Sequence, residues 1–553
     1  MGFTVYGAPI GWTSIVLAVL ASMGGFIFGY DTGQISDILL MEDFLRRFGQ
    51  KQSDGTYAFS NVREGLIVAL LSIGTLIGAV AGSYISNWIG RRRAMSVFCA
   101  VFSVGLLIQV CSFTSWVQIM MGRFIAGWGV GALSAAVPVY QSETAPKEIR
   151  GSLVSTYQLL ITAGIFVAYA ICIGTRYLDT NGASWRIPIA LGWVWAVALG
   201  VGIMFMPESP RWLIQNGKFD AARISLAKVR GVPVESDHVE YAFGEIATDV
   251  KKEEAAGKGT WLECFIGHPG IPKLAYRTFL GMMLQALQQL TGANYFFYYG
   301  ATVFQNVGLS DSYKSQLIFG GINFACTFFG IWVMERFGRR WPLIIGGVWQ
   351  AAWLFAYASV GVTHDTTQRG TGQFLIAASA LFIFGYASTW APGIWILTGE
   401  TFPTRTRQKQ ASLAVASNWI WNFLIAFFTP FITQNINYSY GYVFAGCNLF
   451  GAVFVYFFLY ESSKLSLENV NHMYGAPGLK PWHSEKWLPE GWSTRNTEME
   501  DSKMNRSQHL ETAAKMTNTI GLQAGHRRFS DEETVTEPQN NAVTTEKQPH
   551  ASA

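Results

Sequence analysis

The sequence predicts an all-α membrane protein with twelve transmembrane helices, arranged as two six-helix halves. Half of the 553 residues are hydrophobic, only 14% are charged, and the mean hydropathy is +0.23. The apolar residues form blocks of ~20 residues, long enough to cross a bilayer, rather than amphipathic stripes. Several short motifs also recur after about 250 residues, which indicates an internal duplication.

About twelve apolar blocks have the length of a membrane span. Short basic turns follow the second, fourth, eighth and tenth blocks, whereas the turns between blocks three and four and between blocks eleven and twelve carry no Lys or Arg. The positive-inside rule therefore predicts that both termini and the central segment are cytosolic, although Arg46, Arg47 and Lys51 are a local exception. The blocks lie near residues 12–32, 64–86, 94–112, 117–140, 152–174, 187–206, 276–300, 314–335, 341–361, 373–398, 410–433 and 440–460.

The same pattern predicts four regions. Residues 1–206 form the N-terminal six-helix half and residues 275–470 the C-terminal half. Between them, residues 207–274 mix charges with helix-forming residues and predict a cytosolic helical linker. Residues 471–553 turn polar, so we expect a disordered cytosolic tail.

Three motifs of the first half return in the second half in the same order, which predicts two parallel structural repeats. The pairs are Gly90-Arg91-Arg92 with Gly338-Arg339-Arg340, Glu143 to Arg150 with Glu400 to Arg407, and Pro207-Glu208-Ser209 with Tyr460-Glu461-Ser462.

Composition and motifs argue against several other classes of protein. The net charge of +4 is too small and dispersed for nucleic-acid binding. The six cysteines lie mostly inside apolar blocks without paired spacing, so neither a metal site nor a disulfide framework is expected. The sequence also shows no nucleotide-binding loop or catalytic constellation, so we expect no cofactor and no enzymatic activity. The first charged residue is Asp31, so the N-terminus lacks the basic region of a cleaved signal peptide.

The stretch 281–300 is apolar enough to span a bilayer, yet it carries Gln285, Gln288, Gln289, Thr291 and Asn294. The three glutamines share one helix face, whereas Asn294 would point ~140° away from Gln289 on an ideal helix, unless the intervening glycine bends the chain. These amides suit hydroxyl groups, and the aromatic run 295–299 offers ring faces for C–H surfaces, as a sugar site requires. The alternative is that the amides only hold helices together; five polar groups in one span favour binding.

Together the motifs resemble the sugar porter family of the major facilitator superfamily, and most of all its fungal hexose transporters. The resemblance covers residues ~25–470. It rests on Phe28 to Asp31, Gly90 to Arg92, Gly122-Arg123 with Gly127, Gly129 and Gly131, Pro138 to Gly151, Pro207 to Arg211, Gln288 to Tyr299, Glu335 to Arg340, Glu400 to Arg407 and Asn418-Trp419. The chain departs from the family pattern at Ser83, Asn87, Trp88 and Tyr460 to Lys464, which bears on gating and not on the fold.

The resemblance implies a central sugar site between the halves. Neutral amides both donate and accept hydrogen bonds, which suits an uncharged polyol better than an anion. Packing or an interfacial belt remains the alternative for Trp395 and Trp419; Trp395 follows Pro392-Gly393, where we expect the helix to break. The residues implied to bind substrate are Phe28, Gln158, Gln288, Gln289, Asn294, Asn323, Trp395, Asn418 and Trp419.

Two further sets of charged residues follow from the resemblance. Asp31 is implied to accept a proton, with Arg123 as its partner; the alternative is a static salt bridge between two spans. A cytosolic charge set is implied to gate transport, although topology signals alone would explain its arginines but not its glutamates. The gating set is Arg91, Arg92, Glu143, Arg150, Glu208, Glu335, Arg339, Arg340, Glu400, Arg407 and Glu461.

The function implied is transport of a hexose, with glucose as the default, across the plasma membrane by alternating access and proton symport. A facilitative uniporter and a sugar receptor that signals through its tail are the alternatives. The expected partners are the sugar, the proton, the lipid bilayer and, for the tail, a cytosolic protein. The residues do not name the sugar.

Overall fold

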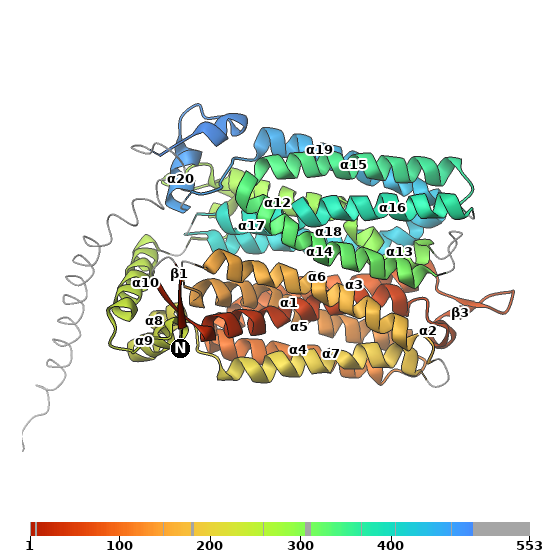
Figure 1. Ribbon diagram of the computed structural model, residues 1–553, viewed down its shortest axis with the longest axis horizontal. Coiled ribbons are helices and arrows are strands. Elements are labelled where there is room, and N and C mark those ends of the chain that lie inside the picture. The colour runs from red at the N-terminus through yellow and green to blue at the C-terminus, as the bar shows by residue number, and fades with distance from the viewer. Residues whose placement is uncertain are drawn as a thin grey trace, which may run out of the picture.

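The computed structural model describes residues 2–5, 8–146, 149–178, 182–257, 259–304, 311–366, 368–403, 405–465 and 467–489. Its helices form two bundles that lie side by side (Figure 1). The N-terminal bundle contains α1 (Trp12–Ile38), α3 (Asn61–Ile89), α4 (Arg91–Val110), α5 (Trp116–Thr144), α6 (Arg150–Thr175) and α7 (Ala183–Gly202). The C-terminal bundle contains α12 (Leu274–Leu290), α13 (Ala293–Phe304), α14 (Ser312–Phe337), α15 (Arg340–Thr363), α16 (Arg369–Gly385), α17 (Ala391–Glu400), α18 (Arg407–Ile436) and α19 (Tyr440–Phe458).

Ten helical segments within the described residues are long and apolar enough to cross a membrane, judged by length and composition. One of them, 407–458, contains both α18 and α19, which a short 3₁₀ turn (η3, Asn437–Ser439) joins. The helices α12 and α13 are each too short to count by themselves, and together they cover residues 274–304. Helices thus lie over each of the twelve apolar blocks in the sequence.

Two long helical stretches of the C-terminal bundle are interrupted. The chain breaks between α12 and α13 at Gly292, whose φ of +91° favours glycine. A Cβ there would also lie 2.6 Å from the Phe444 ring, so the close approach requires glycine as well. The second interruption is a π-helical turn (η2, Tyr386–Trp390) between α16 and α17. This turn lies just before Pro392, whose ring cannot follow a regular helical turn.

The two ends of the paired bundles differ (Figure 1). At one end, the linker end, lie η1 (Ile203–Phe205), α8 (Pro210–Gln215), α9 (Phe219–Arg230), α10 (Asp237–Ala256) and α11 (Glu263–Ile266). At the opposite end, the α2 end, lie α2 (Glu42–Phe48) and the hairpin of β3 (Gln50–Lys51) and β4 (Tyr57–Ala58). A second hairpin, β1 (Gly2–Val5) with β2 (Ala8–Gly11), precedes α1.

A hydrogen bond and an ion pair connect the linker helices to the bundles. Ser14 at the start of α1 donates a hydrogen bond to the Val229 carbonyl of α9 at 2.6 Å. On the other bundle, Arg405 pairs with Glu263 of α11 at 3.1 Å. This hydrogen-bonded arginine is the main reason that the pKa of the Glu263 carboxyl lies below its usual value.

The structure differs from the sequence prediction at the beginning of the tail. Residues 471–487, expected to be disordered, contain the end of α20 (Leu467–Gly475) and the 3₁₀ helix η4 (Pro481–Lys486). Tyr474 packs over the Arg277 guanidinium at 4.0 Å, and Ser484 Oγ accepts a hydrogen bond from the Glu461 backbone N–H at 2.9 Å. Contacts of both kinds, from an aromatic ring and from a hydroxyl, thus attach this stretch to the C-terminal bundle. Residues 490–553 lie outside the described residues.

The two bundles meet closely at the α2 end. Arg176 at the end of α6 donates two hydrogen bonds to Asp311, which precedes α14, at 2.5 and 2.7 Å. Nearby, Asn61 of α3 donates to Gln434 of α18. Deeper in the seam, Ser72 of α3 donates to Asn422 of α18 at 2.6 Å. These contacts close the seam between the bundles at the α2 end.

Candidate functional site

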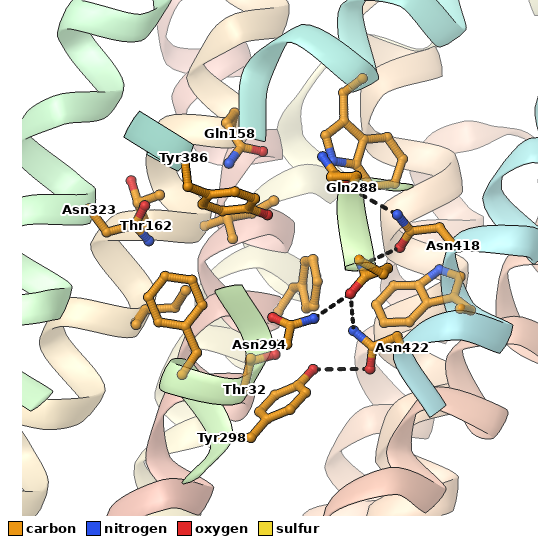
Figure 2. A pocket seen from close by; sticks show the side chains of 17 residues that line it. Thr32, Gln158, Thr162, Gln288, Asn294, Tyr298, Asn323, Tyr386, Asn418 and Asn422 are labelled. Carbon is orange, nitrogen blue, oxygen red and sulfur yellow. Dashed lines mark hydrogen bonds between the residues drawn. The ribbon is translucent and has the colours of Figure 1, made fainter. Parts of the chain in front are cut away.

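A cavity lies between the two bundles near the middle of their length (Figure 2). All nine residues that the sequence implies for substrate binding line it. Eight further residues also line it: Thr32, Ile161, Thr162, Ile165, Phe297, Tyr298, Tyr386 and Asn422. Both bundles contribute, so any relative movement of the bundles reshapes the cavity.

The break at Gly292 brings Asn294 to the cavity. On an uninterrupted helix Asn294 would point away from Gln289, but in the structure Asn294 Nδ2 donates a hydrogen bond to Gln289 Oε1 at 2.5 Å. The left-handed backbone at Gly292 turns α13 relative to α12, so both amides face the same space. The sequence allowed for a bend of the chain at this glycine, and the bend is what the structure shows, so the direction on an ideal helix does not apply to Asn294.

Gln289 is the centre of an amide network that lines the cavity, and Figure 2 labels its partners Asn294, Asn418 and Asn422. Its Nε2 donates to Asn418 Oδ1 at 2.8 Å, and its Oε1 accepts from Asn294 and, at 3.3 Å, from Asn422 Nδ2. The side-chain oxygen thus uses both of its lone pairs, whereas one of the two N–H groups remains for a ligand. Tyr298 extends the network by donating to Asn422 Oδ1 at 3.2 Å.

Gln288 keeps an unused hydrogen-bond acceptor, whereas Gln289 keeps an unused donor. Its Nε2 donates to the carbonyls of Trp390 and Ala391, at 3.1 and 3.3 Å, where η2 meets α17. Its Oε1 accepts one bond, from Asn418 Nδ2 at 2.8 Å, so one lone pair remains. Gln288 therefore offers an acceptor and Gln289 a donor, which together match hydroxyl groups that both donate and accept.

Gln285 and Thr291 do not line the cavity. Gln285 donates to Thr398 Oγ1 at 2.9 Å, and Thr291 donates to the Gln288 carbonyl at 2.7 Å. Gln285 thus joins α12 to α17, as the structural alternative for the amides has it, whereas the Thr291 hydroxyl bonds to a carbonyl of its own helix. Of the aromatic run 295–299, only Phe297 and Tyr298 line the cavity.

Three polar atoms among the lining residues lack hydrogen-bond partners within the described structure. They are Trp419 Nε1, a donor, Asn323 Oδ1, an acceptor, and the hydroxyl oxygen Thr32 Oγ1, which can do both. The Trp419 ring also packs edge-on against Phe28 from the other bundle, with ring centroids 5.4 Å apart. A buried polar atom without a partner is costly, so all three atoms are suited to a polar ligand.

Three of the lining residues that sequence reasoning missed lie one helical turn from residues it found. Asn422 follows Asn418 by four positions, Thr162 follows Gln158, and Thr32 follows Phe28. Residues at i and i+4 share a helix face, so this spacing is the signal that could have found them.

Asp31 and Arg123 face each other inside the N-terminal bundle and do not line the cavity. Both side chains are buried, and Arg123 Nη1 lies 3.9 Å from Asp31 Oδ2, which is longer than a hydrogen bond. Asp31 Oδ1 accepts from Gln34 Nε2 at 2.9 Å, whereas Oδ2 has no hydrogen-bond partner among the described residues. The pair is therefore loosely held.

The predicted gating charges form one cluster in each bundle at the linker end. In the first, Arg91 binds Glu143 through Nε and Nη2 at 2.9 and 3.0 Å, and Glu208 accepts from the backbone N–H groups of Arg91 and Arg92. Glu208 thereby caps the N-terminus of α4, where a carboxylate is favoured. Ser209 Oγ completes the cluster by donating to Glu143 at 2.5 Å.

The second cluster repeats the first. Arg339 binds Glu400 through Nε and Nη2 at 3.1 and 2.6 Å, Glu461 accepts from the Arg339 and Arg340 N–H groups, and Ser462 donates to Glu400 at 2.7 Å. Of the other members of the set, Glu335 is exposed, Arg407 Nε donates to the Phe402 carbonyl at 3.3 Å, and the side chain of Arg150 lies outside the described part of the structure.

Comparison with known proteins gives a consistent result. The family model for "Sugar (and other) transporter" matches residues 17–474. The low-affinity glucose transporter HXT1 of Saccharomyces cerevisiae is 45% identical over 484 residues, which cover 86% of this chain and 84% of the relative. The high-affinity glucose transporter ght2 of Schizosaccharomyces pombe is 42% identical over 515 residues, covering 92% and 96%.

Solved structures agree with this assignment. The proton:xylose symporter XylE, bound to 6-bromo-6-deoxy-D-glucose, has a TM-score of 0.69 and 26% identity, covering 83% of this chain and 99% of that chain. The inward open conformation of XylE from E. coli has a TM-score of 0.68 at the same identity and coverage. The chain belongs to the sugar porter family of the major facilitator superfamily.

Proposed function

We propose that this protein carries a hexose, with glucose as the principal substrate, across the plasma membrane by alternating access. The observation that carries the proposal is the pairing of Gln288 and Gln289, which leaves one acceptor and one donor in a cavity between two bundles. A neutral site of this kind suits an uncharged polyol. Relatives above 40% identity support the substrate class, since their names include glucose and galactose transporters.

In this proposal all twelve apolar blocks cross the bilayer, and the broken pair α12–α13 forms one span. Both termini and the linker are cytosolic, as the basic turns predict. The linker end is then cytosolic and the α2 end extracellular. Closure of the bundles at the α2 end corresponds to a transporter whose extracellular gate is shut.

We further propose that Asp31 couples sugar movement to the proton gradient. The loose contact with Arg123 supports this role, because a carboxylate with one unpartnered oxygen can accept a proton without first breaking a tight ion pair. The charge clusters at the linker end act in the cytosolic gate. Each cluster fixes helix ends within its own bundle, so the bundles move as rigid bodies.

Uptake of radiolabelled hexose by cells that lack their own hexose transporters tests the proposal. Accumulation above the external concentration, abolished by a protonophore, is the expected result. Equilibration without accumulation would replace symport by uniport, and absence of uptake despite normal surface expression would overturn the transport proposal.

A further inference from the structure

A second buried carboxyl lies on α1 six residues beyond Asp31, toward the α2 end. Asp37 is 0% exposed, and neither of its carboxylate oxygens has a hydrogen-bond partner among the residues that the structure describes. An ionised carboxylate without a partner is costly inside a protein, whereas the neutral acid is tolerated much better. The closed arrangement of the bundles therefore suits a protonated Asp37.

The same helix provides a hydrogen-bond acceptor for a protonated Asp37 carboxyl. Asp31, Gln34 and Asp37 follow one another at three-residue spacing, which places neighbouring members of the row side by side on α1. Gln34 Nε2 donates to Asp31 at 2.9 Å, but Gln34 Oε1 is buried without a donor in the described structure. A proton on Asp37 supplies a donor that this row lacks.

Asp37 lies where the bundles meet. Its backbone carbonyl accepts a hydrogen bond from Tyr313 Oη of α14 at 3.2 Å, and the adjacent Ser36 Oγ accepts from Gln316 of the same helix at 2.9 Å. Several titratable or charged groups surround it. They are Tyr169, Cys172 and Arg176 from α6, Tyr313 of α14, Asp311 just before α14, and Lys314, which pairs with Asp311.

Arg176 interacts electrostatically with two carboxyls, Asp37 of its own bundle and Asp311 of the other. Here it donates both Nη groups to Asp311 of the opposite bundle, while its Nε is buried without a partner. If the bundles separate at the α2 end, Asp311 departs with α14, whereas Arg176 and Asp37 stay together because α6 and α1 belong to the same bundle. Asp37 is then the carboxylate that remains near the guanidinium.

We propose that Asp37 is a second proton-binding site, which takes up a proton from the extracellular solution as the gate closes and returns it to the same solution as the gate opens. The carboxylate gains an O–H bond when Arg176 turns to Asp311, and loses it when Arg176 becomes available as its partner. This inference rests on the proposed alternating access, but not on coupling through Asp31, since Asp37 carries no net proton across the membrane. External acid stabilises the closed gate.

A cross-linking experiment tests the gate directly. Asn61 and Gln434, which bond across the seam, are replaced by cysteines in the full chain after Cys111→Ser removes an exposed native thiol. The rate of disulfide formation is then measured at each pH for this parent and for its Asp37→Asn derivative. Both proteins carry the same two cysteines, so the effect of pH on thiol ionisation cancels in the ratio of the two rates. We expect the derivative to cross-link faster than the parent at neutral pH and at the same rate in acid. Because one proton is involved, the ratio of the two rates should change by at most about tenfold per pH unit.

Control variants separate titration from structure. Asp37→Glu, which keeps a titratable group, should restore a pH-dependent ratio, and Asp54→Asn, which neutralises an exposed acid at the same end, should match the parent. A ratio for Asp37→Asn that is constant with pH would overturn the inference. So would a profile that depends on replacing sodium by N-methylglucamine, because Asp37 would then bind a metal cation. Hexose uptake, measured on the same proteins, reports separately on the proposed function.

Discussion

The replacement Gln288→Ala tests the assignment of the cavity most directly. It removes the one acceptor lone pair that Gln288 leaves for a ligand, and the two hydrogen bonds to the carbonyls of Trp390 and Ala391. An unmet hydroxyl costs about 1–3 kcal/mol, so the apparent affinity for hexose should fall by about 5- to 150-fold. Asn418 Nδ2 still has Gln285 Oε1 as an acceptor at 2.7 Å, so this part of the network should remain folded.

Gln289→Ala should be more damaging, because Gln289 also orients three asparagines. Loss of about three hydrogen bonds, at roughly 1 kcal/mol each, should lower thermal stability as well as affinity. The assay is KM for uptake per surface molecule, together with the thermal stability of the purified protein. Gln350→Ala, at a buried amide outside the cavity, is the matched control and should leave KM unchanged. An unchanged KM for Gln288→Ala, with normal surface expression, would refute the reasoning.

Three other predictions follow. Asp31→Asn should abolish protonophore-sensitive accumulation yet permit sugar exchange; persistent accumulation would exclude coupling there. A stop after Lys480, which deletes η4, should lower thermal stability, whereas a stop after Pro489 should not; equal melting temperatures would show that η4 adds no stability. The hydrogen-bonded Arg176 holds the pKa of Asp311 below its usual value, so this ion pair contributes stability above the unfolded pKa of ~3.9 and loses it as pH falls through the folded pKa. Arg176→Gln should flatten that acid limb of a thermal-stability profile; an unchanged limb would exclude the pair as its cause.

Only part of the cavity lining was predictable from local signals. Amides are rare in apolar spans, which singles out Gln288, Gln289 and Asn294, whereas the other predicted lining residues came from the resemblance to the sugar porter family. Asn422 and Thr162 were missed, although each lies one helical turn from a predicted residue. The connectivity of the network was not predictable, because it depends on the backbone angle at Gly292 and on how closely α18 approaches α12. Sequence indicated that Gly292 could bend the chain, but not the direction in which α13 would turn.

The structured beginning of the tail escaped prediction for a related reason. Between residues 467 and 487 the apolar side chains that share one helix face, Val470, Met473 and Tyr474, span little more than one turn, which is too short a signal to predict an ordered segment. They are ordered by contacts far away in sequence, since Val470, Met473 and Tyr474 pack with Tyr460, and Tyr474 also stacks on Arg277. Composition does not predict such contacts. The Gly-Arg-Arg and Glu motifs, in contrast, recur in the same order in both halves, so the sequence itself predicts two matching clusters.

The two charge clusters at the linker end have a consequence for biosynthesis. Gly90 and Gly338 both adopt positive φ, of +96° and +85°, and a Cβ at either would lie within 2.7 Å of the capping glutamate, Glu208 or Glu461. Arg91, Glu143, Glu208 and Ser209 all precede the C-terminal bundle, so the first cluster is complete once the ribosome has passed Ser209. The N-terminal bundle can therefore be locked before the second is translated, and the two bundles expressed as separate polypeptides should still recognise each other in the membrane.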